Sequence, residues 1–133
     1  MPATLTVRDE TTFSGDEDRI FEIEVPAERI AVRDLIEARV TAEVERYNAS
    51  SVGEVFRGLI QPSRTERVLN GFRVGKGRKI DAAEQRKLAL EAFYRNGFIL
   101  LVDDRQVMDL DEEIAVRPET AVTFLKLVPL VGG

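Results

Sequence analysis

Two stretches near the start of the chain alternate polar and apolar residues. Residues 4–7 place Leu5 and Val7 on one face, and residues 21–25 alternate apolar side chains with glutamates. A period of two is typical of strands that bury one face. Residues 14–18 between them have the composition of a turn. The pattern predicts an antiparallel hairpin with one face in water.

After Pro26 the apolar period becomes that of a helix. One stripe of apolar side chains recurs every three or four positions: Val32, Leu35, Ile36, Val40, Val44 and Tyr47. This spacing predicts a helix that packs its stripe against the core and ends at residues 48–51. The charged side chains of the same stretch lie largely off the stripe: Arg33, Glu37, Arg39, Glu43, Glu45 and Arg46.

The stretch that follows has a weaker pattern. Apolar positions within residues 52–60 predict a short helix, which Pro62 would stop. Turn residues at 70–71 and 75–77 flank the apolar positions of residues 72–74. Those positions predict a short strand or one arm of a hairpin.

A second helix begins with a capping box. Asp81 is placed to cap the helix, and Glu84 follows it by three positions. The helix is predicted over residues 82–96, where Asn96-Gly97 supplies the carboxyl-terminal cap. Its apolar stripe consists of Leu88, Ala89, Ala92 and Phe93.

The rest of the chain predicts three further strands. Residues 98–102 are continuously apolar, as in a strand covered on both faces. Asp103-Asp104 predicts a turn, and residues 105–107 a short returning strand. Residues 117–120 predict another turn before a last strand over residues 121–128.

Three single residues complete this pattern. Leu110 and Ile114 are apolar within a polar connection, so we expect them to anchor it in the core. We expect Lys126 in the last strand to point to water.

The composition excludes several kinds of chemistry. The 133 residues suit a single domain over residues 1–133, and they contain no cysteine and no histidine. Disulfides, cysteine zinc sites, thiol catalysis and histidine acid–base catalysis are therefore excluded. We expect no enzyme. We find no signal peptide and no apolar run near the roughly 20 residues of a membrane span, so we expect a cytoplasmic protein.

Two polar stretches suit solvated loops better than binding sites. Residues 75–79 are glycine-rich and basic but lack the spacing of a Walker phosphate loop. Residues 103–104 and 109–113 are acidic but lack the spacing of a calcium loop. We therefore expect no metal and no cofactor.

The final segment is β-prone and closes on Gly132-Gly133. Two glycines pack against nothing, because they have no side chain. They can instead thread a narrow channel and present a carboxylate to the active site of another protein. This chemistry requires a suitable fold in the residues that precede the tail.

The predicted order of strands and helices before the tail resembles the ubiquitin-like β-grasp family, which includes ubiquitin and the bacterial sulfur carriers of molybdopterin and thiamine synthesis. The resemblance covers residues 4–47 and 98–133. It rests on the strand-to-helix junction at 25–36, the strand, turn and connection at 98–114, and the tail at 123–133. It implies an α+β fold with a mixed sheet of about 4–5 strands. One helix lies across that sheet, and the last strand is central and parallel to the first.

Two departures distinguish the chain within that family. Residues 48–97, including helix 82–96, form an atypical insertion, and the tail lacks the arginines of ubiquitin's tail. Lengthening a loop costs only about 0.6 kcal/mol per doubling, so the insertion does not oppose the fold. Bacterial ubiquitin-like modifiers are the closest match.

The resemblance implies that this protein is a substrate of conjugation. An activating enzyme would adenylate the Gly133 carboxylate, and a conjugating enzyme would pass it to a nucleophile on a target that the sequence does not identify. A deconjugating protease would release it. Residues 129–133 would form a flexible tail, recognised through Gly132, Val131, Leu130, Pro129 and Leu127. Sulfur carriage through a thiocarboxylate and a non-covalent adaptor role remain alternatives.

The family also implies a partner-binding face on the side of the sheet opposite the helix. In this chain Ile99, Leu101 and Leu125 would form it. Strict alternation is broken near the end of the last strand, so the register there stays open.

Charge is distributed unevenly along the chain. Residues 57–87 hold nine basic and three acidic residues, a net +6, which leaves −11 on the rest of a chain of net charge −5. A basic docking surface is one interpretation, formed by Arg64, Arg67, Arg73, Lys76, Arg78 and Lys79. It could bind an acidic enzyme or the acidic face of another copy, giving a homo-oligomer. The alternative is that it folds back onto its own acidic core; nucleic acid is a weaker partner for this acidic chain.

Overall fold

The fold mixes helices and strands. The computed structural model describes residues 2–11, 19–49, 55–62, 65–68, 71–74 and 78–127. In chain order its elements are β1 (Ala3–Thr11), β2 (Arg19–Val25), β3 (Arg29–Ala31), α1 (Val32–Ala49), β4 (Val55–Phe56), β5 (Glu66–Val68), β6 (Gly71–Arg73), α2 (Ala82–Tyr94), β7 (Phe98–Val102), β8 (Arg105–Val107), β9 (Glu113–Ala115) and β10 (Ala121–Lys126).

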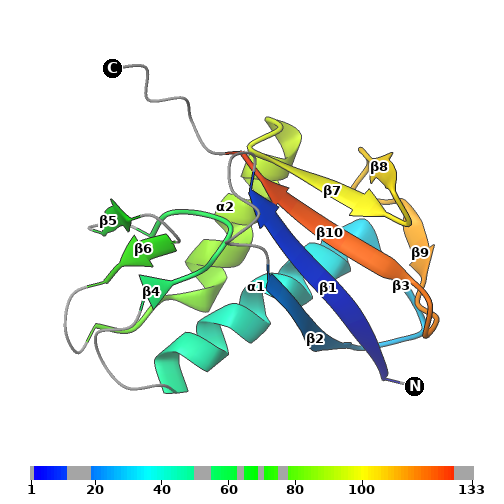
Figure 1. The fold of residues 1–133 in the computed structure, drawn as a ribbon, viewed down its shortest axis with the longest axis horizontal. Helices are drawn as coiled ribbons and strands as arrows, with labels where there is room; N and C mark the ends of the chain where they lie inside the picture. Colours follow the sequence, from blue (N-terminus) through cyan, green and yellow to red (C-terminus); the bar gives the residue numbers. More distant parts are fainter. Residues whose placement is uncertain are drawn as a thin grey trace.

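The main sheet has five strands in the order β2-β1-β10-β7-β8. β10 lies between β1 and β7, parallel to β1 and antiparallel to β7 (Figure 1). The predicted first hairpin is present, because β1 and β2 pair antiparallel. β7 and β8 form a second hairpin through Asp103 and Asp104, whose φ angles are 50° and 67°. The first and last strands are therefore neighbours in the middle of the sheet.

Helix α1 lies across one face of this sheet (Figure 1). All six residues of the predicted apolar stripe are buried. They face alternate residues of the strands, among them Leu5 and Val7 of β1, Leu100 of β7 and Phe124 of β10. Burial of these apolar surfaces is the main stabilising contribution to the fold.

A two-stranded sheet of β3 and β9 has no counterpart among the predicted elements. This small sheet places residues 108–112, which connect β8 to β9, against the first turn of α1. There the carbonyls of Glu112 and Leu110 accept hydrogen bonds from the N–H groups of Val32 and Arg33, at 2.8 and 3.0 Å. These carbonyls replace the side-chain cap that the sequence lacks. Leu110 is buried, as is Ile114, which confirms both predicted anchors.

The region between the helices forms a small sheet in the order β4-β6-β5. The short helix predicted within residues 52–60 is wrong, since β4 occupies part of that range. A Cβ atom at Gly71 would lie 2.4 Å from the Phe56 carbonyl oxygen, so glycine permits the close approach of β6 to β4. The Phe56 side chain packs edge-on against the Tyr47 ring of α1, with ring centroids 5.6 Å apart.

Helix α2 begins where the capping box predicts. Asp81 Oδ1 accepts the Glu84 N–H at 3.2 Å. The helix ends at residue 94, before the predicted residue 96. Asn96 has a left-handed φ of 56°, and the Gly97 N–H donates to the Ala92 carbonyl at 2.8 Å. This geometry is a Schellman cap. The buried residues of α2 are Gln85, Ala89 and Phe93.

Strand β7 is covered fully on one face only. Its buried residues are Phe98, Leu100 and Val102. Ile99 and Leu101 alternate with them and are half-buried on the opposite face. The prediction of a strand covered on both faces is therefore wrong.

Candidate functional site

The sheet face opposite α1 carries the three apolar residues of the predicted partner-binding face. Leu125 of β10 pairs with Ile99 of β7, and Leu101 pairs with Thr123 in the next cross-strand row. The three apolar side chains are each half-buried. They form an apolar strip across two adjacent strands.

The other half of this face is polar. A groove of about 450 Å³ is lined by Thr6, Arg8, Glu10, Ile20, Asp104, Pro118, Glu119, Thr120, Ala121, Val122 and Thr123. Ile20 is 61% exposed, and Arg8 forms an ion pair with Glu10 at 3.3 Å. Glu22 and Glu24 of β2 are exposed next to them. The apolar strip therefore borders an acidic surface.

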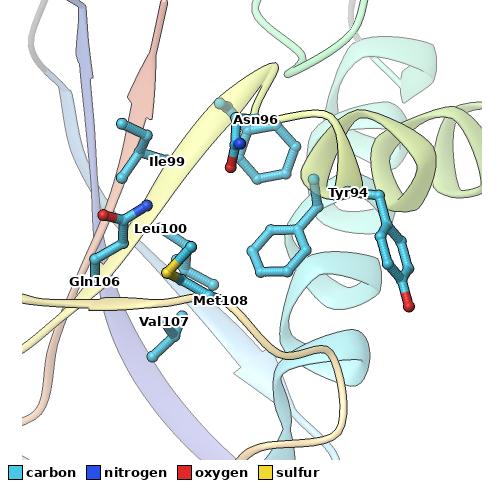
Figure 2. A pocket seen from close by; sticks show the side chains of 9 residues that line it. Tyr94, Asn96, Ile99, Leu100, Gln106, Val107 and Met108 are labelled. Carbon is cyan, nitrogen blue, oxygen red and sulfur yellow. The ribbon is translucent and has the colours of Figure 1, made fainter.

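A smaller pocket of about 110 Å³ lies between the end of α2 and strands β7 and β8 (Figure 2). Its floor consists of buried Phe93, Phe98, Leu100 and Val107. Tyr94 and Met108 are 79% and 72% exposed at its rim. Figure 2 shows the Tyr94 hydroxyl pointing away from the pocket. The described lining contains no carboxylate, lysine or arginine, so the pocket offers apolar contact and no charged acid–base group.

The tail begins at the end of β10. Lys126, the last residue of the strand, pairs with Phe98 of β7 and Thr11 of β1. Leu127 follows and is 38% exposed. The other predicted tail residues lie outside the described residues: Pro129, Leu130, Val131, Gly132 and Gly133.

Lys126 does not point to water as predicted. It shares the helix-facing side of β10 with Val122 and Phe124, and its side chain is partly buried. The alternation of the strand explains this, because every second residue after Val122 faces α1. A lysine thus enters the edge of the core where the tail starts.

Beside Lys126 lies a buried ionic cluster that the sequence pattern did not predict. We call it the Arg39 cluster, and it consists of Asp9, Arg19, Arg39, Glu43 and Lys126. Arg39 is fully buried in the middle of α1, and Asp9 and Glu43 are 1% and 4% exposed. The prediction that placed Arg39 and Glu43 off the buried stripe is therefore wrong.

The hydrogen bonds of the cluster connect three parts of the fold. Arg39 Nε and Nη2 donate to the two carboxylate oxygens of Asp9, at 3.3 and 2.6 Å. Arg39 Nη2 also donates to the Arg57 carbonyl beyond β4 at 3.1 Å. Arg19 Nη2 bridges Asp9 and Glu43, at 3.0 and 2.6 Å. The cluster therefore joins α1 to β1, to β2 and to the region between the two helices.

Aromatic rings and burial shape the electrostatics of the cluster. The Arg39 guanidinium lies 5.2 Å from the Phe21 ring centroid and 5.7 Å from that of Phe124. Burial alone would raise the pKa of Glu43, but hydrogen bonds and charges from Arg19, Arg39 and Arg46 lower it below the ordinary 4.5. Burial, with Arg39 and Arg19, lowers the pKa of Lys126 below the ordinary 10.5; Asp9 and Glu43 offset this only in part.

A signal for this cluster is present in the sequence. Residue 9 continues the inward-facing alternation of Leu5 and Val7, so its carboxylate must face α1. Around the helix axis, Arg39 and Glu43 lie within the angular range of the apolar stripe, between Leu35 and Ile36. Two opposite charges at core positions indicate a buried pair, because single buried charges are very unfavourable.

The predicted basic docking surface is described only in part. Its described side chains are those of Arg73 and Lys79, which are exposed, and Arg78, which is half-buried. Arg64, Lys76 and the side chain of Arg67 lie outside the described residues. On α2, Arg86 donates to the Thr41 hydroxyl at 3.1 Å, which joins α2 to α1.

The chain matches no protein-family model, no curated protein and no solved structure. Within the described ranges, no group of three acidic side chains could hold a metal ion. No helix in that part of the chain is long and apolar enough to cross a membrane.

Proposed function

We propose that this protein is a ubiquitin-like modifier with a β-grasp fold, joined to target proteins through Gly133. The observation that carries the proposal is the strand order β2-β1-β10-β7-β8, with β10 parallel to β1 and α1 across one face. The ubiquitin-like family has the same arrangement. In this chain the central strand runs into residues 127–133, which close on Gly132-Gly133.

The chemistry of the proposal balances with ATP as the co-reactant. The Gly133 carboxylate attacks the α-phosphate of ATP, which forms an acyl adenylate and releases pyrophosphate. An amine of the target then attacks the acyl carbon, AMP leaves, a proton is lost and an amide bond forms. Glycine at both final positions lets the backbone approach the enzyme closely, because no Cβ intervenes.

The partners of this proposal are an activating enzyme, a conjugating enzyme and a deconjugating protease, all in the cytoplasm. Leu127 offers the first apolar contact of the tail, directly after the end of β10. Pro129, Leu130 and Val131 would supply the next contacts, with proline reducing the entropy lost on docking.

A non-covalent role is favoured by a separate observation. The apolar strip of Ile99, Leu101 and Leu125 is half-buried, and it borders an acidic surface. Such a surface suits a partner that is apolar in the middle and basic at one side. The basic inserted region of a second copy fits this description, so an adaptor or a homo-oligomer is the second candidate function.

Intact-mass measurement tests the covalent proposal. The protein is incubated with ATP and the activating enzyme, with and without target proteins. We expect adducts of the target that carry the whole chain, and none from a variant lacking Gly132 and Gly133. Replacement of one Gly133 carboxylate oxygen by sulfur would instead indicate a sulfur carrier. Conjugation of the truncated variant would contradict the proposal.

A matched variant separates the two candidate functions. Leu101→Asp changes the apolar strip and leaves the tail intact. If the protein is a modifier, the variant is still adenylated, whereas the truncated variant is not. If the protein acts only as an adaptor, Leu101→Asp abolishes partner binding and the truncation has no effect.

A further inference from the structure

The Arg39 cluster holds more positive than negative charge. Its cations are Arg19, Arg39 and Lys126, and its anions are Asp9 and Glu43, which gives a net +1. This excess lies in a chain whose net charge is −5. Excess charge in a partly buried site is unfavourable unless a further counter-charge reaches it.

The carboxylate oxygens of the cluster are already engaged. Both Asp9 oxygens accept from Arg39, and one of them also accepts from Arg19. One Glu43 oxygen accepts from Arg19, and the other accepts two hydrogen bonds from Arg46, which approaches from the surface. Among the residues that the structure describes, the cluster therefore has fewer free acceptors than donors.

Two donor groups show the shortage directly. Arg39 Nη1 is buried and has no hydrogen-bond partner; it lies 4.0 Å from the nearest Glu43 oxygen. Among the described contacts, the Lys126 ammonium forms no ion pair, although it lies close enough to Asp9, Arg39, Arg19 and Glu43 to interact electrostatically.

The exposed part of the cluster lies at the start of the tail. The Arg19 side chain is 20% exposed, and Lys126 is partly exposed. β10 ends at Lys126 and β1 ends beside it at Thr11, so the site lies at the carboxyl ends of the two central strands. Leu127 follows Lys126 directly, so a partner that binds residues 127–133 approaches this end of the sheet.

We propose that Arg19 and Lys126 form a binding site for one oxyanion, and that its occupant is a carboxylate side chain of the protein that takes the tail. The occupant supplies the missing acceptor to Lys126 and neutralises the excess charge. Charge-assisted hydrogen bonds in a partly desolvated site are stronger than those at an open surface. The identity of the partner rests on the proposed function, but the oxyanion site does not.

Sulfate is the probe for the site itself. Thermal unfolding of the full chain is measured in sodium sulfate and in sodium chloride of equal ionic strength. We expect sulfate to shift the folding equilibrium of the wild type by about tenfold when its concentration is ten times its Kd. Lys126→Gln should lose this binding contribution and keep only the general stabilisation by sulfate.

The control is Lys87→Gln, which removes the same charge from an exposed position on α2. It should keep the full sulfate effect, because general salt effects act equally on both variants. An equal sulfate effect in the wild type and Lys126→Gln would overturn the site.

The second measurement tests the occupant. In the adenylation reaction, Lys126→Glu should raise KM for the modifier at least tenfold and leave kcat unchanged, and Lys126→Arg should restore KM. An unchanged KM with a confirmed sulfate effect would overturn the partner and keep the site. Absence of adenylation in the wild type would count against the proposed function, while the sulfate result would still decide the site.

Discussion

Asn48 forms two hydrogen bonds with the backbone of Ile80. Its Nδ2 donates to the Ile80 carbonyl at 3.0 Å, and its Oδ1 accepts the Ile80 N–H at 2.9 Å. Asn48 lies near the end of α1, and Ile80 precedes the cap of α2. One side chain therefore fixes the start of the second helix against the end of the first.

Asn48→Ala should destabilise the protein by about 1–3 kcal/mol, because it leaves two backbone groups of buried Ile80 without partners. Chemical denaturation followed by circular dichroism measures this loss. Glu45→Ala, at an exposed position of the same helix, is the control and should change stability by less than about 0.5 kcal/mol. Similar values for the two variants would show that the contact is not maintained in solution.

Asp9→Asn should cost about 3–5 kcal/mol, since it leaves the fully buried Arg39 charge without its main counter-charge. The double variant Asp9→Leu with Arg39→Met should lose much less than the sum of the single variants, because neither charge remains. Arg8→Ala tests an exposed ion pair on the same strand and should cost about 0–1 kcal/mol. If the losses of unfolding free energy in the two single variants simply added up in the double variant, the buried pair of Asp9 and Arg39 would be contradicted.

Acid should weaken the fold through Glu43. Its folded-state pKa is below the ordinary 4.5, so its contribution is complete above that value and is lost as the pH falls through the folded pKa. We expect the free energy of unfolding to fall more steeply with acid in the wild type than in Glu43→Gln. An equal dependence of the unfolding free energy on pH below 4.5 in the two proteins would contradict the lowered pKa of Glu43.

Lys126→Met should raise the melting temperature at neutral pH. Burial lowers the pKa of Lys126 below 10.5, which means that keeping it charged costs free energy in the folded state. That cost is present at neutral pH and is relieved as the pH rises from the folded pKa to 10.5, so the difference between variant and wild type should shrink there. A lower melting temperature for the variant at pH 7 would contradict this reasoning.

Leu101→Asp should leave the fold intact, because Leu101 lies on the half-buried face of β7. Leu100→Asp should unfold the protein, because Leu100 is fully buried against the core. Circular dichroism of the two variants is the direct comparison. Loss of structure in Leu101→Asp would mean that this face is covered in solution.

The regular elements could be predicted because local patterns specify them. The period of two gives β1 and β2, the period of the apolar stripe gives α1, and Asp81 with Glu84 gives the start of α2. β3 and β9 were missed because each has only three residues, and they form by pairing across a long sequence separation. β4 was misassigned because its apolar residues also fit a helical period.

The candidate site was predicted less completely. The strip of Ile99, Leu101 and Leu125 follows from strand alternation, which also sets Lys126 toward α1. The Arg39 cluster was missed because Arg39 and Glu43 were placed off the apolar stripe, whereas their position in the helical period lies within it. Pairing of Arg39 with residue 9 depends on how α1 crosses the sheet, which no local pattern specifies.

The central position of β10 determines when the sheet can form during synthesis on the ribosome. β1 emerges early, yet one of its two edges stays open until β10, more than a hundred residues later, has left the exit tunnel. Until then β2 and α1 can shield only part of its apolar face, and a row of backbone donors and acceptors is exposed. The nascent chain should therefore acquire its native sheet only late in synthesis, and folding should be slow for its size, because parallel pairing of distant segments must precede closure of the core.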